Sequence, residues 1–323
     1  MAELGLVVLV YVDDCFWVVP KFQEADAPDA TWVLRIFEYV TGHLLGWQLD
    51  PDKSAVGTQI TLLGLEVTMG CTTSSWRLSA DKSAQWCSDI ANYLPQDYLR
   101  PSEASRLAGR LAFLNSHVYS RLARALLRPI IWRQTQQGGS YTLTRRLKWS
   151  LQWFYEALSA HWTREVPYEL PTPEDQVILY TDAESHGHVA AVVLHRTGRW
   201  YMAGNLPQDI RGLLRRRRTN IVGYELMAAL VGIYMVDDMF PHQAFVRHFV
   251  DNQPALNAII RGSSKQDDLN SLVGSVWYGC ASMLQSYWGQ YVRSKANLSD
   301  GPSRQEVPIN EAAEDCANYL LCG

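Results

Sequence analysis

The sequence has little cysteine, and the cysteine it has is not arranged to bind zinc. None of the six cysteines forms a C-x-x-C pair, and none stands at zinc-ligand spacing from a histidine. We therefore expect reduced thiols in an intracellular protein, either cytoplasmic or nuclear. The cysteines are Cys15, Cys71, Cys87, Cys280, Cys316 and Cys322.

Long hydrophobic runs, internal repeats and low-complexity tracts are also missing. The apolar segment 4–10 is too short to span a bilayer and leads directly into acidic residues, so we expect neither a signal peptide nor a membrane anchor. With 47% hydrophobic and 19% charged residues, the composition is typical of a globular protein. The 323 residues are many for one compact core and suit two domains, or one domain with an appended module.

Positive charge is scarce overall but concentrated in two places. The formal net charge is −4, yet residues 97–165 carry eleven Lys or Arg against four Asp or Glu, a local net charge of +7. A second basic island, Arg211 with residues 215–218, precedes an acidic cluster. This segregation favours a polyanionic partner, although a solvated charged face is the commoner explanation on composition alone.

Two acidic residues stand between two apolar segments near the start of the sequence. Residues 6–12 and 15–19 are rich in β-branched and aromatic side chains, and they predict a hairpin with Asp13 and Asp14 at its tip. Adjacent carboxylates repel each other unless a cation lies between them, so the tip is a candidate metal site. The alternative is an ordinary surface turn, because acidic turns are common.

Three further segments follow this hairpin. Apolar positions at helical spacing predict an amphipathic helix over residues 29–44. A turn over residues 46–54 contains the isolated Lys53, and residues 62–67 predict another strand. The order of Y-x-D-D box, helix, G-x-x-L-x-x-x-K turn and L-G-L-E strand resembles the C-terminal half of the palm of reverse transcriptases.

By this resemblance, Asp13 and Asp14 would be the acidic pair of a polymerase metal site, with Asp13 as the direct ligand. Lys53 would be the basic residue of the next motif, and residues 63–65 part of the strand that grips the primer. Two-metal nucleotidyl transfer also needs an upstream carboxylate and fingers. Only twelve residues precede Asp13, and Glu3 is the sole acid among them. We therefore expect no polymerase activity from this chain, which looks like a truncated element, an incomplete gene or one fragment of a longer protein.

A basic stripe accompanies an apolar stripe over residues 103–128. Both recur every three or four residues, so one helix, or two nearly collinear ones, would place the arginines beside the buried side. In the resemblance this region is the thumb and connection, where a basic helix follows the duplex backbone; a solvated face is the alternative. Residues 106–113 are similar to tyrosine-recombinase (DIRS-like) retroelements in particular. The arginines expected to bind nucleic acid are Arg106, Arg110, Arg121, Arg124 and Arg128, with Arg215, Arg216, Arg217 and Arg218 from the second island.

The second half predicts a sheet that gathers carboxylates. Asp182 and Asp251 each follow an apolar strand, Glu225 lies on a helix between those strands, and Asp300 lies in a late loop. Four converging anions would repel, and a divalent cation is the usual solution; oxygen ligands favour Mg²⁺ or Mn²⁺ over zinc. Taken singly, each could be a solvated or helix-capping residue. The expected strands cover 177–182, 189–195, 199–203, 244–250 and 287–292, and the expected helices 221–238 and 266–284.

The order of strand with Asp, helix with Glu, strand with Asp and late Asp resembles ribonuclease H, carried by residues 181–183, 224–226, 250–252 and 297–300. The resemblance implies that two Mg²⁺ or Mn²⁺ ions support hydrolysis of the RNA strand of an RNA/DNA hybrid, with selection through 2′-hydroxyl contacts. Many cellular members carry a histidine before the last aspartate, and residues 293–296 contain none. Product release or metal exchange would then be slower, or another group would assist.

The fold class expected is α/β (α+β), with two halves separated by a proline cluster near residue 170. The expected function is that of a retroelement reverse transcriptase/ribonuclease H fragment that cleaves RNA in hybrids. Its partners would be RNA/DNA hybrid, other nucleic acid and the missing N-terminal part of the polyprotein, with no membrane. The alternatives are a non-catalytic nucleic-acid-binding remnant, or an RNA-directed DNA polymerase active only with that missing half. The expected regions are a partial palm (1–75), a helical thumb or connection (76–168), a ribonuclease H-like mixed five-stranded sheet with helices (174–305) and a tail (306–323).

Overall fold

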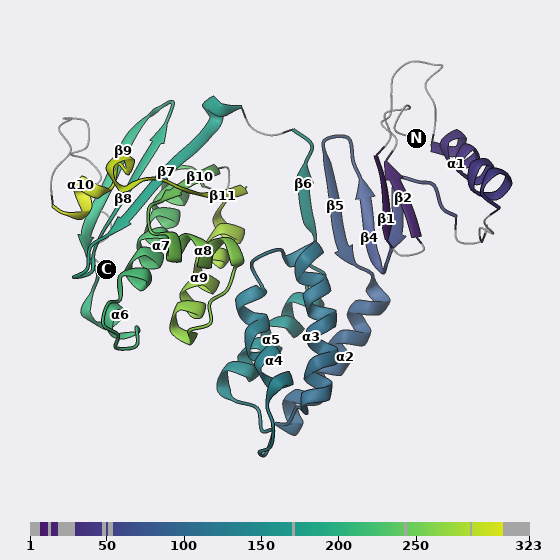
Figure 1. The fold of residues 1–323 in the computed structure, drawn as a ribbon, viewed down its shortest axis with the longest axis horizontal. Helices are drawn as coiled ribbons and strands as arrows, with labels where there is room; N and C mark the ends of the chain where they lie inside the picture. The colour runs from purple at the N-terminus through teal and green to yellow at the C-terminus, as the bar shows by residue number, and fades with distance from the viewer. Residues whose placement is uncertain are drawn as a thin grey trace.

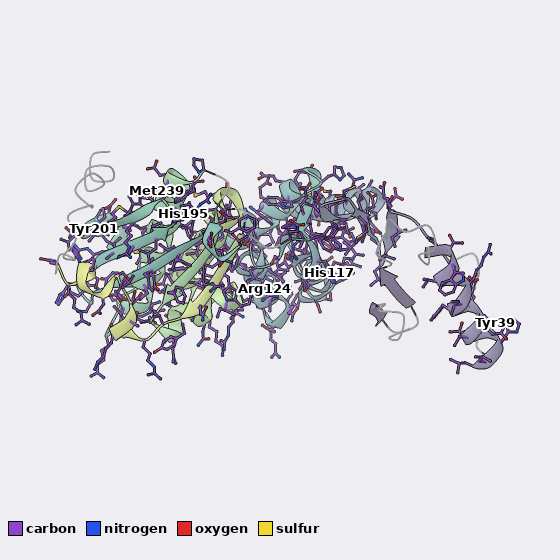
Figure 2. All side chains as sticks on the ribbon, turned by 90° about the horizontal axis from the view of Figure 1, so that it is seen from above. Tyr39, His117, Arg124, His195, Tyr201 and Met239 are labelled. Atoms are coloured by element: carbon purple, nitrogen blue, oxygen red, sulfur yellow. The ribbon has the colours of Figure 1, made fainter. Side chains whose placement is uncertain are left out.

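The computed structural model shows a hairpin, a helical region with its own sheet, and a larger mixed sheet with helices, following one another along the molecule (Figure 1). Seen from above, the helical region with His117 and Arg124 lies between the hairpin and the larger sheet (Figure 2). Asp13, Lys53 and the tail 306–323 lie outside the described residues. The structure describes residues 7–11, 14–18, 30–46, 50, 54–169, 172–241, 244–284 and 286–305.

The N-terminal hairpin forms as the sequence predicts. Strands β1 (Val7–Tyr11) and β2 (Asp14–Val18) pair antiparallel, with Tyr11 opposite Asp14. The run of β-branched and aromatic residues favours this extended pairing. Helix α1 (Ala30–Tyr39) continues into the π-helical turn η2 (Val40–Leu44), which together match the predicted helix 29–44.

A four-stranded antiparallel sheet follows, and it corrects one prediction. Residues 62–67 do not form a single strand, because Leu63 and Gly64 have φ of 53° and 85° and turn the chain into a hairpin. Two consecutive positive φ values are the backbone requirement of a tight two-residue turn. The sheet has the order β3-β4-β5-β6, from β3 (Gln59–Leu62), β4 (Leu65–Met69), β5 (Thr73–Leu78) and β6 (Arg164–Pro167).

The helices of the basic region pack on one another around a shared core. The two helices expected to be nearly collinear instead pack against each other, because the chain turns at Ser120, where φ is 54°. This packing buries the apolar stripe, including Leu107, Leu111 and Leu114. The elements are α2 (Ala80–Gln96), α3 (Pro101–Leu114), the π-helical turn η4 (Asn115–Tyr119), α4 (Arg124–Thr135) and α5 (Arg145–Ser159).

The second half forms a mixed five-stranded sheet with the order β11-β10-β7-β8-β9. Strands β7, β8 and β9 make the predicted antiparallel meander, and β10 lies parallel to both β7 and β11. The strand carrying the first predicted carboxylate is thus central. The strands are β7 (Gln176–Ala183), β8 (His188–His195), β9 (Gly198–Asn205), β10 (Phe245–Val250) and β11 (Ser286–Tyr291).

Long helices cover one side of this sheet (Figure 1). Helix α7 is apolar almost all round, so it lies in the core between the sheet and α9. Its Gly232 permits close contact, since a Cβ there would lie 2.9 Å from Leu179 and Thr181 side-chain atoms. None of the described helices is long and apolar enough to cross a membrane. The helical elements are η5 (Pro173–Asp175), α6 (Gln208–Gly212), α7 (Ile221–Met239), α8 (Gln253–Arg261), α9 (Asp267–Met283), η6 (Ser294–Ala296) and α10 (Asp300–Ser303).

Candidate metal centre

Strand β7 delivers Asp182 to the end of the sheet. The strand is held on both sides, by β10 in parallel and by β8 in antiparallel register, so the position of Asp182 is fixed. The residue is only 6% exposed, and its Oδ2 accepts a hydrogen bond from the Ser303 hydroxyl. Burial raises the pKa of Asp182 to about 6, with Asp251 and Asp300 adding like-charge repulsion.

Helix α7 brings Glu225 to the same point. Glu225 is 3% exposed, and its Oε2 has no hydrogen-bond partner among the residues that the structure describes. Burial, together with the negative charges of Asp182 and Asp251, raises the pKa of Glu225 to about 9. A buried, unpartnered carboxylate oxygen requires either a proton or a cation.

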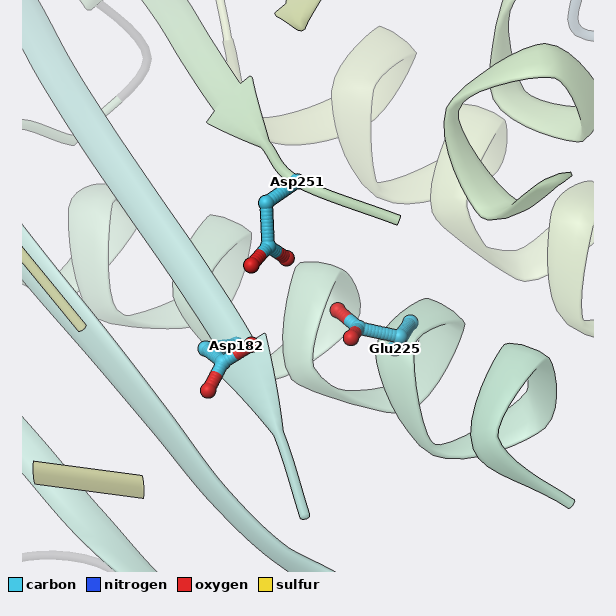
Figure 3. Close-up of side chains that lie close together, drawn as sticks. All are labelled: Asp182, Glu225 and Asp251. Carbon is cyan, nitrogen blue, oxygen red and sulfur yellow. The ribbon is translucent and has the colours of Figure 1, made fainter. Parts of the chain in front are cut away.

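Asp251 completes a triad of carboxylates. It follows directly after β10, and the next residue, Asn252, accepts a hydrogen bond from the backbone N–H of Ala255 at 3.0 Å and so caps α8. One carboxylate oxygen from each of Asp182, Glu225 and Asp251 lies within 4.8 Å of the others. Figure 3 shows the three side chains close together. The parallel pairing of β7 and β10 explains the convergence, because equivalent strand ends meet at one edge of a sheet.

Asp300 lies near the triad but not within it. It lines the same cleft as Asp182 and Glu225. Its Oδ1 accepts an ion-paired hydrogen bond from Arg304 at 2.7 Å, four residues further along. The structure therefore brings three of the four predicted carboxylates together and holds the fourth at the rim. A role for Asp300 as a metal ligand stays a prediction.

The short helix α10 is tied to the centre by contacts that the sequence did not indicate. Asn297 Nδ2 donates to the Thr181 carbonyl at 3.1 Å, and His188 Nδ1 lies 2.9 Å from the Ser303 carbonyl. Ser303 is buried and donates its hydroxyl to Asp182. A serine in a Gly-Pro-Ser turn carries no local sign of such a bond, because the bond depends on how distant segments dock.

A buried histidine braces the strands behind the carboxylates. His248 on β10 lies 2.7 Å from the Thr181 hydroxyl through Nε2 and 2.6 Å from the Tyr287 hydroxyl through Nδ1. This chain of hydrogen bonds joins β7, β10 and β11. Burial lowers the pKa of His248 to about 3, so the ring is neutral at physiological pH.

The structure describes no side chain of the polymerase-type residues predicted from the sequence. Asp13 and Lys53 lie outside the described residues, and of Asp14 only the place of its backbone at the start of β2 is described. Their predicted roles stay predictions.

The arginines of the predicted basic stripe make contacts within the protein. Arg121 and Arg124 contact the second half, and the other three arginines contact helices of the same helical region. These contacts brace the helices, and a role in nucleic-acid binding stays a prediction. Arg106 donates to the Tyr93 hydroxyl (3.4 Å), Arg110 pairs with Asp89 (2.5 Å), Arg121 lies over the Trp277 ring (5.3 Å), Arg124 donates to the Arg261 carbonyl (3.2 Å), and Arg128 lies over the Trp132 ring (5.3 Å).

The second basic island alternates between paired and free side chains. Arg215 pairs with Asp267 at 2.6 Å, and Arg217 pairs with Asp268 at the beginning of α9. Arg216 and Arg218 are exposed and have no partner in the part of the chain that the structure describes. Arg216 and Arg218 are therefore available to an external anion without breaking an ion pair among the described residues.

No known protein family matches this sequence, and no curated protein matches it. Solved structures resemble part of it, and two of them are RNase H domains. The RNase H1 of the halophilic archaeon Halobacterium salinarum NRC-1 is 15% identical, with a TM-score of 0.32, over 41% of this chain and 96% of that one. The N-terminal RNase H domain of Rv2228c from Mycobacterium tuberculosis, fused to maltose-binding protein, is 15% identical, with a TM-score of 0.31, over 41% and 92%. At this identity neither similarity says what this chain does.

Proposed function

We propose that this chain is a metal-dependent nuclease that hydrolyses the RNA strand of RNA/DNA hybrids, within a retroelement polyprotein of reverse transcriptase/ribonuclease H type. The observation that carries the nuclease proposal is the convergence of Asp182, Glu225 and Asp251. Three carboxylates within 4.8 Å of each other are unfavourable in a folded protein unless a cation or protons neutralise them.

The donor set fits hard divalent cations. The orphaned Oε2 of Glu225 gains a partner when a cation is present, and the carboxylates of Asp182 and Glu225 can then stay ionised at neutral pH. All three ligands offer oxygen, which favours Mg²⁺ or Mn²⁺ over zinc. Asp182, Glu225 and Asp251 would hold the ions, with Asp300 as a further ligand if its pair with Arg304 opens.

The protein residues position the reacting groups. When bound, divalent ions supply an activated water for in-line attack on the phosphodiester and stabilise the leaving 3′ oxygen. Ser303 orients Asp182, since its hydroxyl can bond only one of the two carboxylate oxygens at a time. Arg304 lines the cleft and offers a positive charge to the phosphate on either side of the cut.

Recognition of the hybrid would combine two kinds of contact. Contacts to 2′-hydroxyls distinguish the RNA strand from the DNA strand. Arg216 and Arg218, which are exposed and unpaired within the described residues, would bind backbone phosphates without reading sequence.

The reverse transcriptase part of the proposal is supported by the Y-x-D-D box at the tip of the β1/β2 hairpin and by the order of motifs after it. DNA synthesis needs a further carboxylate, which the proposal assigns to another part of the same polyprotein. Hydrolysis is therefore the activity proposed for this chain.

The test is cleavage of an end-labelled RNA/DNA hybrid in Mg²⁺ by the wild type and by Asp182→Asn. The wild type should cut the RNA strand, and the variant should lose at least about a hundredfold in rate, as expected when a ligand to catalytic metal is neutralised. Asp209→Asn is the matched control, because Asp209 is exposed on α6 and outside the cleft.

A folded wild-type protein that leaves the hybrid intact in both Mg²⁺ and Mn²⁺ contradicts the nuclease proposal. Binding of the hybrid without cleavage would point to the non-catalytic remnant. Primer extension by this chain alone would contradict the assignment of synthesis to another part.

A further inference from the structure

The side of the five-stranded sheet that faces away from α7 and α9 carries aromatic and cationic residues. Along β10, Val246 and Val250 point into the core shared with the helices, so Phe245, Arg247 and Phe249 point to the other side. In Figure 1 the long helices lie on one side of the sheet, and Figure 2 looks onto the other. At the acidic end of the sheet, the short α10 contacts β7, β8 and β9.

The register aligns one row of residues across the sheet. Arg247 lies opposite Trp288 on β11 and opposite Ile178 on β7. Through Leu194 on β8, the same row reaches Arg199 on β9. Trp288 is 63% exposed, and both arginines are exposed. The row thus has a cation near each end and a large open ring on the edge strand.

The next row is aromatic. Tyr180 on β7 lies opposite Phe249 on β10, with their rings stacked at 5.0 Å and an interplanar angle of 16°. Through Val192, Tyr180 aligns with Tyr201 on β9, which Figure 2 labels. We call the set Tyr180, Phe249, Tyr201, Trp288, Arg199 and Arg247 the outer sheet face.

The charges of the outer sheet face are uncompensated. Neither Arg199 nor Arg247 has an ion-pair partner among the residues described, unlike Arg215 and Arg217. Trp288 is exposed and the other three rings are half-buried, so accessible aromatic surface lies beside free cations. Accessible rings and free cations are the two ingredients by which proteins hold single-stranded nucleic acid. Bases stack on the rings, and the backbone phosphates meet the arginines. A purely apolar occupant would leave both arginines beside it without a counter-charge.

We propose that the outer sheet face binds a single-stranded stretch of nucleic acid beside the metal centre. Asp182 lies on the same side of the sheet as Tyr180, two residues further along β7, so a strand stacked on the rings leads toward the cleft. Rings on β7, β10 and β11 span about 10 Å, because neighbouring strands lie about 4.8 Å apart. Because the Tyr180 and Phe249 rings stack on each other, that pair offers one platform across this distance and Trp288 a second. This site goes beyond hydrolysis, which does not require it.

The experiment measures binding of fluorescein-labelled single-stranded DNA and RNA 20-mers by fluorescence anisotropy in EDTA, where no cleavage occurs. Trp288→Ala should weaken binding about tenfold, the loss of one base stack, and Trp288→Phe should retain most of it. Trp149→Ala is the matched control, because Trp149 is 64% exposed on α5 of the other half. Arg247→Gln should lower the slope of log affinity against log salt by about 0.7. Comparison of the DNA and RNA arms shows which strand the face prefers.

Unchanged binding by Trp288→Ala, or an equal loss in Trp149→Ala, overturns the proposal. If Trp288→Ala binds normally but dissociates a dimer in sedimentation, the face is an interface between copies. If it binds normally but unfolds several degrees lower, another part of this chain covers the face. A blunt hybrid without single-stranded ends should be cut equally by wild type and Trp288→Ala. The binding assay in EDTA therefore tests the outer sheet face, and the cleavage assay in Mg²⁺ tests the proposed hydrolysis separately.

Discussion

Asn270 of α9 donates a hydrogen bond from its side-chain Nδ2 to the backbone carbonyl of Ala125 in α4, at 2.9 Å and fully buried, between residues 145 positions apart. Beside it, Arg124 donates to the Arg261 carbonyl at 3.2 Å. The helical region and the second half are thus joined by bonds directed at backbone atoms. Such bonds fix the relative position of two surfaces more closely than apolar contact alone.

Asn270→Ala should weaken this junction. The Ala125 carbonyl and the Ser264 N–H, which donates to Asn270 Oδ1 at 3.0 Å, both lose their partner. We expect a loss of about 1 to 3 kcal/mol in the free energy of unfolding, and separation of one urea transition into two. Ser275→Ala, on the exposed side of α9, is the control. A single transition at the wild-type midpoint would contradict the prediction.

Glu225→Gln should stabilise the metal-free protein at alkaline pH. The pKa of Glu225 is about 9 in the folded state against 4.5 ordinarily, so between these values the folded state keeps a proton that the unfolded state releases. Stability therefore falls as pH rises through this window, by at most about 1.4 kcal/mol per pH unit for one group. The glutamine stays neutral and removes this slope. Thermal unfolding in EDTA from pH 5 to pH 9 measures it.

At pH 8, Mg²⁺ should make the wild type more stable than Glu225→Gln. The wild type should gain about 2.7 kcal/mol at a concentration one hundred times the dissociation constant, and Glu225→Gln should gain less. The same unfolding scan with and without Mg²⁺ shows the difference. An equal shift in both proteins would mean that the ions bind elsewhere.

His248 should make the protein sensitive to acid. Its pKa of about 3 in the folded state lies below the ordinary 6.5. Between these pH values the unfolded state binds a proton that the folded state does not. Its contribution to stability is complete above pH 6.5 and is lost progressively as pH falls toward 3. His248→Gln should unfold more easily at pH 7 but lose less stability between pH 6.5 and pH 4. His186→Gln, at a histidine whose side chain is 84% exposed, is the control.

Replacing the unpaired arginines of the second basic island should affect hybrid binding, whereas replacing a paired one should affect stability. Replacing Arg216 and Arg218 by alanine should weaken hybrid binding and lower its salt slope by about one unit per lost phosphate contact. Arg217→Ala should instead lower the melting temperature, because the Asp268 carboxylate, whose side chain is only 8% exposed, loses its cation. Salt titrations by anisotropy and thermal unfolding of the same proteins distinguish the two. If both sets of variants changed hybrid binding and melting temperature equally, the distinction between paired and unpaired arginines would be wrong.

Much of the second half was predictable because its periodicity is unambiguous. Predicted strand 177–182 is observed at Gln176–Ala183, and predicted helix 221–238 at Ile221–Met239. Apolar strands that end in Asp182 and Asp251 were enough to place those residues together, since parallel strands share an edge. The pair of Asp300 with Arg304 was missed because a loop was expected there, and only a helical turn brings side chains four residues apart together.

The first half was less predictable for a related reason. Residues 62–67 are uniformly apolar apart from Gly64 and Glu66, so periodicity could not reveal the turn at Leu63. Strand β6 was missed because it carries a proline and pairs with β5, almost a hundred residues earlier. The break at Ser120 was also hidden, since the apolar stripe continues through it from α3 to α4.

The bond from Ser303 to Asp182 joins residues 121 positions apart. A ribosome completes β7, α7 and β10 well before it adds α10, and contacts of such long sequence separation form slowly. The three carboxylates can meet earlier, but Asp182 is held in one orientation only after residue 303 has emerged. Under the proposed function, cleavage that depends on this orientation of Asp182 would therefore begin only after α10 has docked.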